Sequence, residues 1–196
     1  MDKLILGVTG GSGSGKSQVC SLFSSMGAQI VDADAIAHSI TDRDDVHGEL
    51  RVEFGSGIFN PDGTLNRRAL GKIVFSDEKE LHILNMITHY RIREAIETAV
   101  RESCSNFVVI DAALLVEAKL DTLCTFVIAV VSPRAMRLQR IMERDHIPYD
   151  DALARINSQK HDCEYAAQSD FVIINNGGVE ELNRRVIEIF QTIRDR

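Results

Sequence analysis

The stretch that decides the fold is residues 4–26, LILGVTGGSGSGKSQVCSLFSSM. It opens with five residues (4–8) whose apolar character is typical of a buried β-strand, and it closes with a helical pattern over residues 16–26. Between them, GGSGSGKS at residues 10–17 fits the pattern G-x-x-x-x-G-K-[ST] at every position. The motif alone is short enough to occur by chance, but a strand leading in and a helix leading out make it specific. We therefore predict a phosphate-binding loop (P-loop).

Each residue type in this loop has a physical task. Glycines let several backbone N–H groups converge on phosphate oxygens, and the helix that follows adds the positive end of its dipole. Lys16 would reach the β- and γ-phosphates of ATP, and the Ser17 hydroxyl would hold Mg²⁺. The alternative is a glycine-rich turn that binds nothing. The residues expected to bind the nucleotide are Gly10, Gly11, Ser12, Gly13, Ser14, Gly15, Lys16 and Ser17.

Other apolar runs predict the rest of the core. They are continuous rather than alternating, as buried parallel strands are, and helical patterns separate them. The runs are residues 4–8, 29–31, 107–110, 126–131 and 171–174. This succession is the signature of βα units. We expect an α/β protein of the P-loop NTPase class, with a five-stranded parallel sheet in a three-layer α/β/α arrangement.

About 75 residues separate the second and third runs, which is too many for one crossover helix. They include the turn Asn60-Pro61-Asp62-Gly63 and a long helical pattern from Asp77 to about Ser103. This segment therefore predicts a helical insertion. We expect a single kinase domain, residues 1–196, with its core in 1–33 and 106–196, a helical acceptor-binding lobe at about 34–105 and a lid at about 134–165.

Acidic residues follow two of the predicted strands. Asp32 and Asp34 come at the carboxyl edge of the sheet, where ligands of open α/β folds bind. Phosphoryl transfer to an alcohol calls for a carboxylate that orients the hydroxyl and takes its proton, but either acid would also cap a helix beginning at Ala35. Asp111 ends the third strand, where it would bind a water of the Mg²⁺ shell or cap the next turn. Position alone leaves these alternatives open.

Four arginines follow the fourth strand, after Ser132 and Pro133, which predict a helix start. They recur at i, i+3, i+6 and i+10, so they share one helix face: Arg134, Arg137, Arg140 and Arg144. Such a stripe is more often a solvated surface. Small P-loop kinases, however, carry a lid in this place whose arginines neutralise the transferring phosphoryl group. We therefore expect Arg140 or Arg144 to act in catalysis.

Bulk composition narrows the class of partner. The net charge of −7 disfavours a general nucleic-acid-binding surface, which needs a cationic face. Four scattered cysteines without a CxxC pair do not indicate a structural metal site. No apolar stretch is long enough to span a membrane, and the start does not fit a signal peptide. We expect a cytoplasmic enzyme acting on small molecules, as a monomer or small homo-oligomer.

Taken together, the motifs resemble the dephospho-CoA kinase family over nearly the whole chain. Six pieces agree in order and separation, although only the P-loop is decisive alone. They comprise residues 7–17; Gly27 with VDADAIA (31–37); Phe54-Gly55, 62–70 and 74–75; LLVE (114–117); Arg140, Arg144 and Gln159; and Ser169-Asp170 with Asn175-Asn176-Gly177.

The resemblance implies transfer of a phosphoryl group from ATP to the ribose 3′-hydroxyl of dephospho-CoA, giving coenzyme A. It implies Asp34 as the base, with Asp32 in support, and it places the Asn175–Gly177 turn near adenine. It also implies an acceptor-binding lobe and a lid that closes over ATP. The other residues that it marks for substrate binding are Arg67, Arg68, His89, Leu115 and Glu117.

Two departures from the family pattern concern the acceptor site more than the phosphoryl chemistry. Tyr90 follows His89 where the family usually has proline, and Gln18 stands next to Ser17 where threonine is frequent.

Three rival functions compete with this interpretation. Another small-molecule kinase of the same fold would keep the P-loop. A GTPase switch predicts an N-K-x-D motif, which is missing, and a scaffold with a dead P-loop predicts the loss of Lys16 or Ser17.

Overall fold

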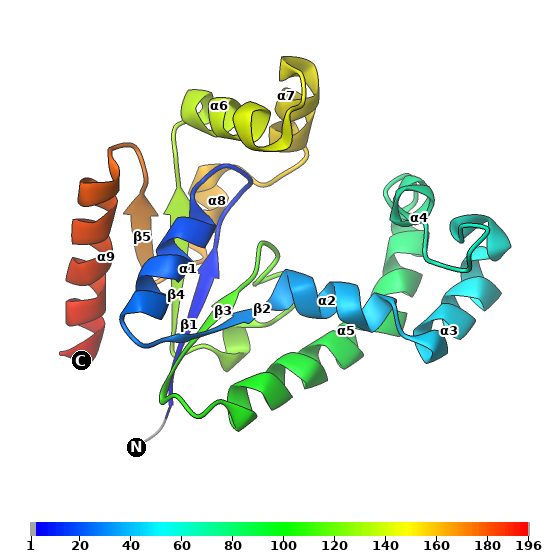
Figure 1. The fold of residues 1–196 in the computed structure, drawn as a ribbon, viewed down its shortest axis with the longest axis horizontal. Coiled ribbons are helices and arrows are strands. Elements are labelled where there is room, and N and C mark those ends of the chain that lie inside the picture. Colours follow the sequence, from blue (N-terminus) through cyan, green and yellow to red (C-terminus); the bar gives the residue numbers. More distant parts are fainter. Residues whose placement is uncertain (1–2, 196) are drawn as a thin grey trace. The chain divides into compact units, whose positions relative to one another are not determined.

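The computed structural model describes residues 3–195 (Figure 1). The strands are β1 (Leu4–Thr9), β2 (Gln29–Asp32), β3 (Phe107–Asp111), β4 (Phe126–Val131) and β5 (Phe171–Ile174). The α-helices are α1 (Lys16–Ser25), α2 (Ala33–Thr41), α3 (Asp44–Phe54), α4 (Arg67–Val74), α5 (Glu78–Glu102), α6 (Arg134–Asp145), α7 (Tyr149–Asn157), α8 (Asp162–Ala167) and α9 (Val179–Arg194). Two short 3₁₀ helices, Ser56–Ile58 and Asp121–Leu123, lie in the connections.

All five strands run parallel in the order β2-β3-β1-β4-β5, so the carboxyl ends of the strands meet at one edge. The strand that carries the P-loop is the central one. At the carboxyl edge, β2 and β3 are in register with Asp32 opposite Asp111. The topology therefore gathers the ends of five separate sequence segments around the P-loop.

Helices cover both faces of the sheet. α1 and α9 pack on one face over a core that includes Leu6, Val8 and Phe23, which are fully buried. On the other face α8 packs against β4, and Leu115 packs so closely beneath Gly7 that a Cβ there would lie 2.6 Å from it. The predicted three-layer α/β/α fold is confirmed (Figure 1).

The chain divides into two compact units. The first comprises residues up to Asp32 and from Glu102 onward, and the second is Ala33–Arg101. The second unit consists of α2, α3, α4 and most of α5 around its own apolar core, which contains Ile40, Leu50 and Ile58. The predicted turn at residues 60–63 is present, with the Gly63 N–H donating to the Asn60 carbonyl at 2.9 Å. Within residues 3–195, every helix is too short or too polar to cross a bilayer.

Two local predictions were wrong. The helix after β2 begins at Ala33 rather than Ala35, so Asp34 lies inside its first turn and does not precede it. Ser132 does not cap α6, which begins at Arg134 with Pro133 as its N-cap. The Ser132 hydroxyl instead donates to the Asn175 carbonyl at 2.7 Å, because a buried hydroxyl bonds to the nearest strong acceptor.

Candidate active site

The P-loop leaves β1 and enters α1 through a backbone that glycine alone adopts without strain. Gly10, Gly13 and Gly15 have φ of 150°, 76° and 97°. Space is equally restrictive, since a Cβ at Gly15 would overlap the Asn175 amide and one at Gly10 would overlap the Val130 carbonyl. The glycines of the motif are thus required both by the turn and by what packs against it.

The N-terminus of α1 carries no acidic side chain in its first turn and no side-chain cap. The first N–H groups of any helix lack intrahelical partners, and here the N-cap is Gly15, which has no side chain to offer. Unlike α3, α5, α7, α8 and α9, which begin with acids, α1 presents these donors and its dipole to an anion. This is the geometry expected of a phosphate-binding helix.

Lys16 forms an ion pair with Asp111, the last residue of β3. Both side chains are largely buried, with relative exposures of 15% and 13%. Asp32 ends the neighbouring strand in register with Asp111. The Lys16 ammonium and the Asp111 carboxylate are therefore paired beside the P-loop, and Asp32 ends the adjacent strand at the same edge of the sheet.

Arg140 extends from α6 to the far side of the loop. Its guanidinium lies 3.1 Å from the Gly13 carbonyl and 3.1 Å from the Ser132 hydroxyl, with longer contacts to Asn175. Within residues 3–195 the structure gives Arg140 no carboxylate partner, so its charge is compensated only by neutral acceptors. Of the arginines on α6, it is the one whose charge is left for an anionic oxygen to pair with.

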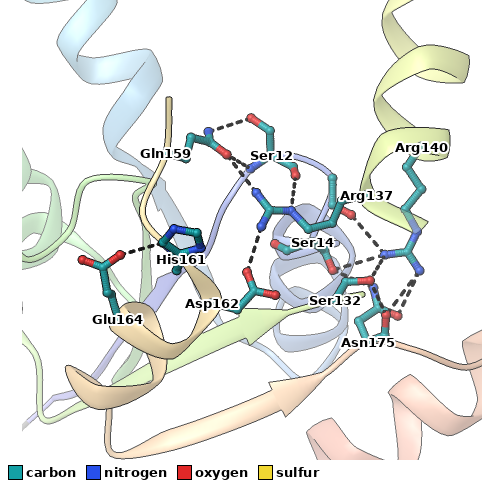
Figure 2. A network of polar contacts seen from close by, with 11 residues as sticks. Ser12, Ser14, Ser132, Arg137, Arg140, Gln159, His161, Asp162, Glu164 and Asn175 are labelled. Carbon is teal, nitrogen blue, oxygen red and sulfur yellow. Dashed lines mark hydrogen bonds and ion pairs between the residues drawn. The ribbon is translucent and has the colours of Figure 1, made fainter. Parts of the chain in front are cut away.

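Arg137, one turn earlier on α6, is only 4% exposed, and Figure 2 shows its side chain among Ser12, Gln159 and Asp162. Its guanidinium donates to the Ser12 carbonyl at 2.9 Å, to Asp162 at 2.8 Å and to Gln159 at 3.0 Å. Gln159 in turn bonds to both the backbone N–H and the hydroxyl of Ser12, at 2.8 and 2.9 Å. The arginine stripe is therefore not a solvated surface at this position.

Asn175 follows β5 and lies beneath the P-loop rather than beside it. It is 3% exposed, and its amide donates to the Ser14 carbonyl at 2.8 Å (Figure 2). The Asn175 side chain therefore points into the protein, where its amide bonds to the P-loop. Gly177, in the same turn, is exposed.

Three predicted residues have other partners in this structure. Arg144 is exposed and pairs with Asp145 at 2.7 Å, which keeps the pKa of that carboxyl well below its usual range. Glu117 pairs with Lys160 at 2.7 Å. Leu115 is completely buried against Gly7, so its side chain belongs to the core, and the prediction that it contacts a substrate does not fit this packing.

The remaining predicted residues lie in the second unit. Asp34 occupies the first turn of α2. Arg67 ties α4 to α2, donating to Thr41 and Asp42 at 2.7 Å each and to the His38 carbonyl at 3.2 Å. Arg68 and His89 are both exposed. The His89 imidazole is nevertheless partly desolvated by its neighbours, which lowers its pKa.

Sequence reasoning left Arg137 out of the site and gave Gln159 no role there. Part of this could have been read from the sequence, because Arg137 shares a helix face with Arg140 and Gln159 lies within the predicted lid segment, 134–165. What cannot be read is that α6 and the segment 159–162 converge on Ser12, because that contact joins residues more than a hundred positions apart.

The oxygen ligands near the loop suit a hard divalent cation. Ser17 lies exposed in the first turn of α1, and Asp32 and Asp111 are adjacent across β2 and β3. Within residues 3–195 no cluster of three or more His, Cys, Asp or Glu side chains forms a complete metal site. Mg²⁺ is commonly held by one or two carboxylates together with substrate phosphates and water, so the residues present fit a cation that arrives with a nucleotide.

One buried atom in the loop is unsatisfied. The Ser14 side chain is fully buried, and its hydroxyl has no hydrogen-bond partner. A buried hydroxyl without a partner is costly. It lies in the loop that the motif assigns to phosphates, which agrees with a site built around a polar ligand.

Comparisons with known proteins agree on one family. A family model described as dephospho-CoA kinase matches residues 4–181. A dephospho-CoA kinase of Halalkalibacterium halodurans is 36% identical over 192 residues, covering 96% of each chain, and one of Carboxydothermus hydrogenoformans is 37% identical over 95% of this chain and 93% of its own.

Solved structures resemble this chain over nearly its whole length, and one of them is a dephospho-CoA kinase. Dephospho-CoA kinase from Campylobacter jejuni superposes with a TM-score of 0.68 at 28% identity and 96% coverage of both chains. A crystal structure from Thermus thermophilus reaches 0.86 at 29% identity over 98% of both. Shikimate kinase from Acinetobacter baumannii, 15% identical with a TM-score of 0.53, shares the fold.

Proposed function

Since the chain belongs to the dephospho-CoA kinase family, we propose that it transfers the γ-phosphoryl group of ATP to the ribose 3′-hydroxyl of dephospho-CoA, giving coenzyme A. The observation that carries the phosphoryl chemistry is the P-loop itself. Lys16, the uncapped N-terminus of α1 and the Arg140 guanidinium all converge on it. The acceptor rests on family membership.

On the donor side, the chain's own groups bind and neutralise phosphate. Lys16 moves from Asp111 toward the β- and γ-phosphates, and the N–H groups at the start of α1 hold the β-phosphate. Arg140 stabilises the charge that develops on the transferring group, because no carboxylate among residues 3–195 competes for it. Arg144, paired with Asp145, would have to change partner to join it.

Mg²⁺ would be held by the Ser17 hydroxyl and the Asp111 carboxylate, with Asp32 beside them. When bound, it supplies positive charge that screens the phosphates and orients the γ-phosphoryl group. The release of Asp111 from Lys16 frees that carboxylate for the task.

On the acceptor side we assign Asp34 as the base and Asp32 as its support. A carboxylate at this point orients the 3′-hydroxyl and takes its proton during direct transfer, without a covalent enzyme intermediate. Residues 34–105 form the acceptor-binding lobe, with Arg67, Arg68 and His89 as contacts, and residues 134–165 form the lid, whose closure excludes water. Glu117 remains a substrate-binding prediction. Of the two residues predicted to contact the adenine ring of ATP, we propose only Gly177, because the Asn175 side chain is bonded to the P-loop.

The partners that follow are two small molecules, ATP and dephospho-CoA, and the expectation that neither nucleic acid nor a membrane is a partner remains a prediction. A cytoplasmic location and a monomer or small homo-oligomer remain predictions. Sedimentation of the purified protein at working concentration measures the oligomeric state directly.

The test of function is ADP release from the purified protein with ATP and Mg²⁺. We expect turnover with dephospho-CoA and none with nucleosides, nucleoside monophosphates or sugars, and the product should carry a 3′-phosphate. Turnover confined to another acceptor would overturn the proposed substrate and leave the kinase assignment intact.

The roles of Lys16 and Asp34 are tested by substitution. Lys16→Ala and Asp34→Asn should each lower kcat at least ~10²-fold, because each removes a group used in the transition state. Asp44→Asn, an exposed acid in the first turn of α3, is the matched control and should leave turnover unchanged. Near-normal turnover of a folded Asp34→Asn variant would remove Asp34 as the base.

A further inference from the structure

Arg137 is buried to a degree that arginine reaches only when its charge is paired. Its three kinds of donor are all engaged. Nε donates to the Ser12 carbonyl, one Nη to the Asp162 carboxylate and the other Nη to the Gln159 amide oxygen. Each nitrogen of the guanidinium therefore donates to a protein group, one of them a carboxylate, whereas Arg140 contacts only neutral acceptors among the residues that the structure describes.

Ser12 is the point on which these bonds converge. Its carbonyl accepts from Arg137, its N–H donates to Gln159, and its hydroxyl accepts from Gln159 (Figure 2). Every polar group of this one P-loop residue is thus held by α6 or by the segment after α7. A loop made largely of glycine has little stiffness of its own, so its shape depends on such external bonds.

The packing of the loop supports the same conclusion independently. A Cβ at Gly11 would overlap the Arg137 guanidinium, and a Cβ at Gly13 would lie 2.7 Å from the Arg137 carbonyl. Gly13 is therefore required by the approach of the Arg137 backbone, and a side chain at position 11 would displace the Arg137 guanidinium. α6 therefore packs directly against the P-loop at these two glycines.

We propose that Arg137 is a positioning residue for nucleotide binding. Held by Asp162 and Gln159, it fixes the Ser12 carbonyl and so presets the P-loop backbone whose N–H groups bind phosphate. The same contacts fix α6, which carries Arg140 three residues further along the same face. Arg137 thereby sets both the loop and the arginine that faces it, without touching the nucleotide.

The inference rests on the proposed role of the loop in binding ATP, and it is independent of the acceptor. The experiment is direct titration of purified protein with ADP, with and without Mg²⁺ and in the absence of dephospho-CoA. Arg137→Met should raise the Kd for ADP by about 10- to 100-fold, the size expected from the loss of charge-assisted bonds. Arg137→Lys keeps the charge beside Asp162 but cannot span Ser12 and Gln159 together, so it should fall in between.

Arg134→Met is the matched control, since Arg134 is exposed on the same helix and bonds to Asn157. It should bind ADP as the parent does. In steady state, Arg137→Met should raise the KM for ATP in proportion to the Kd, while the KM for dephospho-CoA changes less than about twofold, a split that general destabilisation would not give.

Circular dichroism establishes whether each variant is folded. Should Arg137→Met fail to fold, Gln159→Met decides, because it removes both bonds to the Ser12 N–H and hydroxyl without burying an unpaired charge. Folded variants that bind ADP as tightly as the parent overturn the proposal. A parent that binds no ADP refutes the ATP-binding function itself, which is a different result.

Discussion

Asn175 illustrates how single residues hold the site together. It is buried beneath the loop, with its amide on the Ser14 carbonyl and its own carbonyl accepting from Ser132. It therefore links the end of β5 to the loop that follows β1 and to the start of α6. A buried carbonyl that loses its donor costs far more than an exposed one, because no water replaces the bond.

Asn175→Ala should lower the free energy of unfolding by about 1–3 kcal/mol, since the Ser14 carbonyl loses its shorter bond inside the protein and keeps only the 3.4 Å contact from Arg140. Urea denaturation measures this. The neighbouring Asn176 is exposed, so Asn176→Ala is the matched control and should change stability by less than about 0.5 kcal/mol. Equal stabilities of the two variants would show that the Asn175 bond contributes nothing.

At the scale of elements, the backbone decides where a glycine is needed. Gly48 lies in the middle of α3 with nothing within 4 Å of where its Cβ would stand. Gly63 has equally open surroundings but a φ of 85°, in the turn at residues 60–63. Both belong to the second unit, so they differ in backbone conformation and not in packing.

Gly48→Ala should raise the free energy of unfolding by about 0.5–1 kcal/mol, because alanine loses less backbone entropy in a helix. Gly63→Ala should lower it by about 1–2 kcal/mol, because the left-handed region is unfavourable for a residue with a Cβ. Chemical denaturation followed by circular dichroism measures both. The same sign of change in the two variants would contradict the assignment of α3 or of the turn.

At the scale of the whole molecule, the packing of helices on the sheet gives the four cysteines different degrees of burial. Cys20 is buried between α1 and the sheet, and Cys124 packs beside Gly7. Burial raises the pKa of the Cys124 thiol to about 12, and burial together with the nearby Asp111 raises that of Cys20 further. Cys104 and Cys163 are exposed.

A thiol reagent at pH 8 should therefore modify two cysteines quickly and two at least roughly 10³-fold more slowly, since the thiolate is the reactive form. The Cys104→Ser/Cys163→Ser double variant should lose the fast phase, and all thiols should react once the chain is unfolded. Because the folded pKa of Cys124 is raised, the unfolded chain releases its proton first. Its contribution to stability is present below pH 9 and is lost as pH rises toward 12.

The modification rates are the test of the burial of Cys20 and Cys124. Four equal rates of thiol modification in the native protein would contradict it.

The sequence by itself determined the elements and the donor chemistry. Apolar runs bounded by turns predicted the five strands, and the P-loop motif predicted a strand, a tight turn and a helix, because these signals are local and depend on neighbouring residues. Family motifs likewise predicted the acceptor, and matches over residues 4–181 agree.

Only the tertiary structure decided how the polar groups are paired. Arg137, Arg140 and Arg144 are indistinguishable on a helical face in the sequence, yet one is buried against Ser12, one faces neutral acceptors beside the P-loop and one pairs with Asp145. In the same way Ser132 was expected to cap a helix and bonds to Asn175 instead. The physical reason is that a buried donor or acceptor takes the partner that folding brings within 3 Å, and such partners lie up to 161 positions away in this chain.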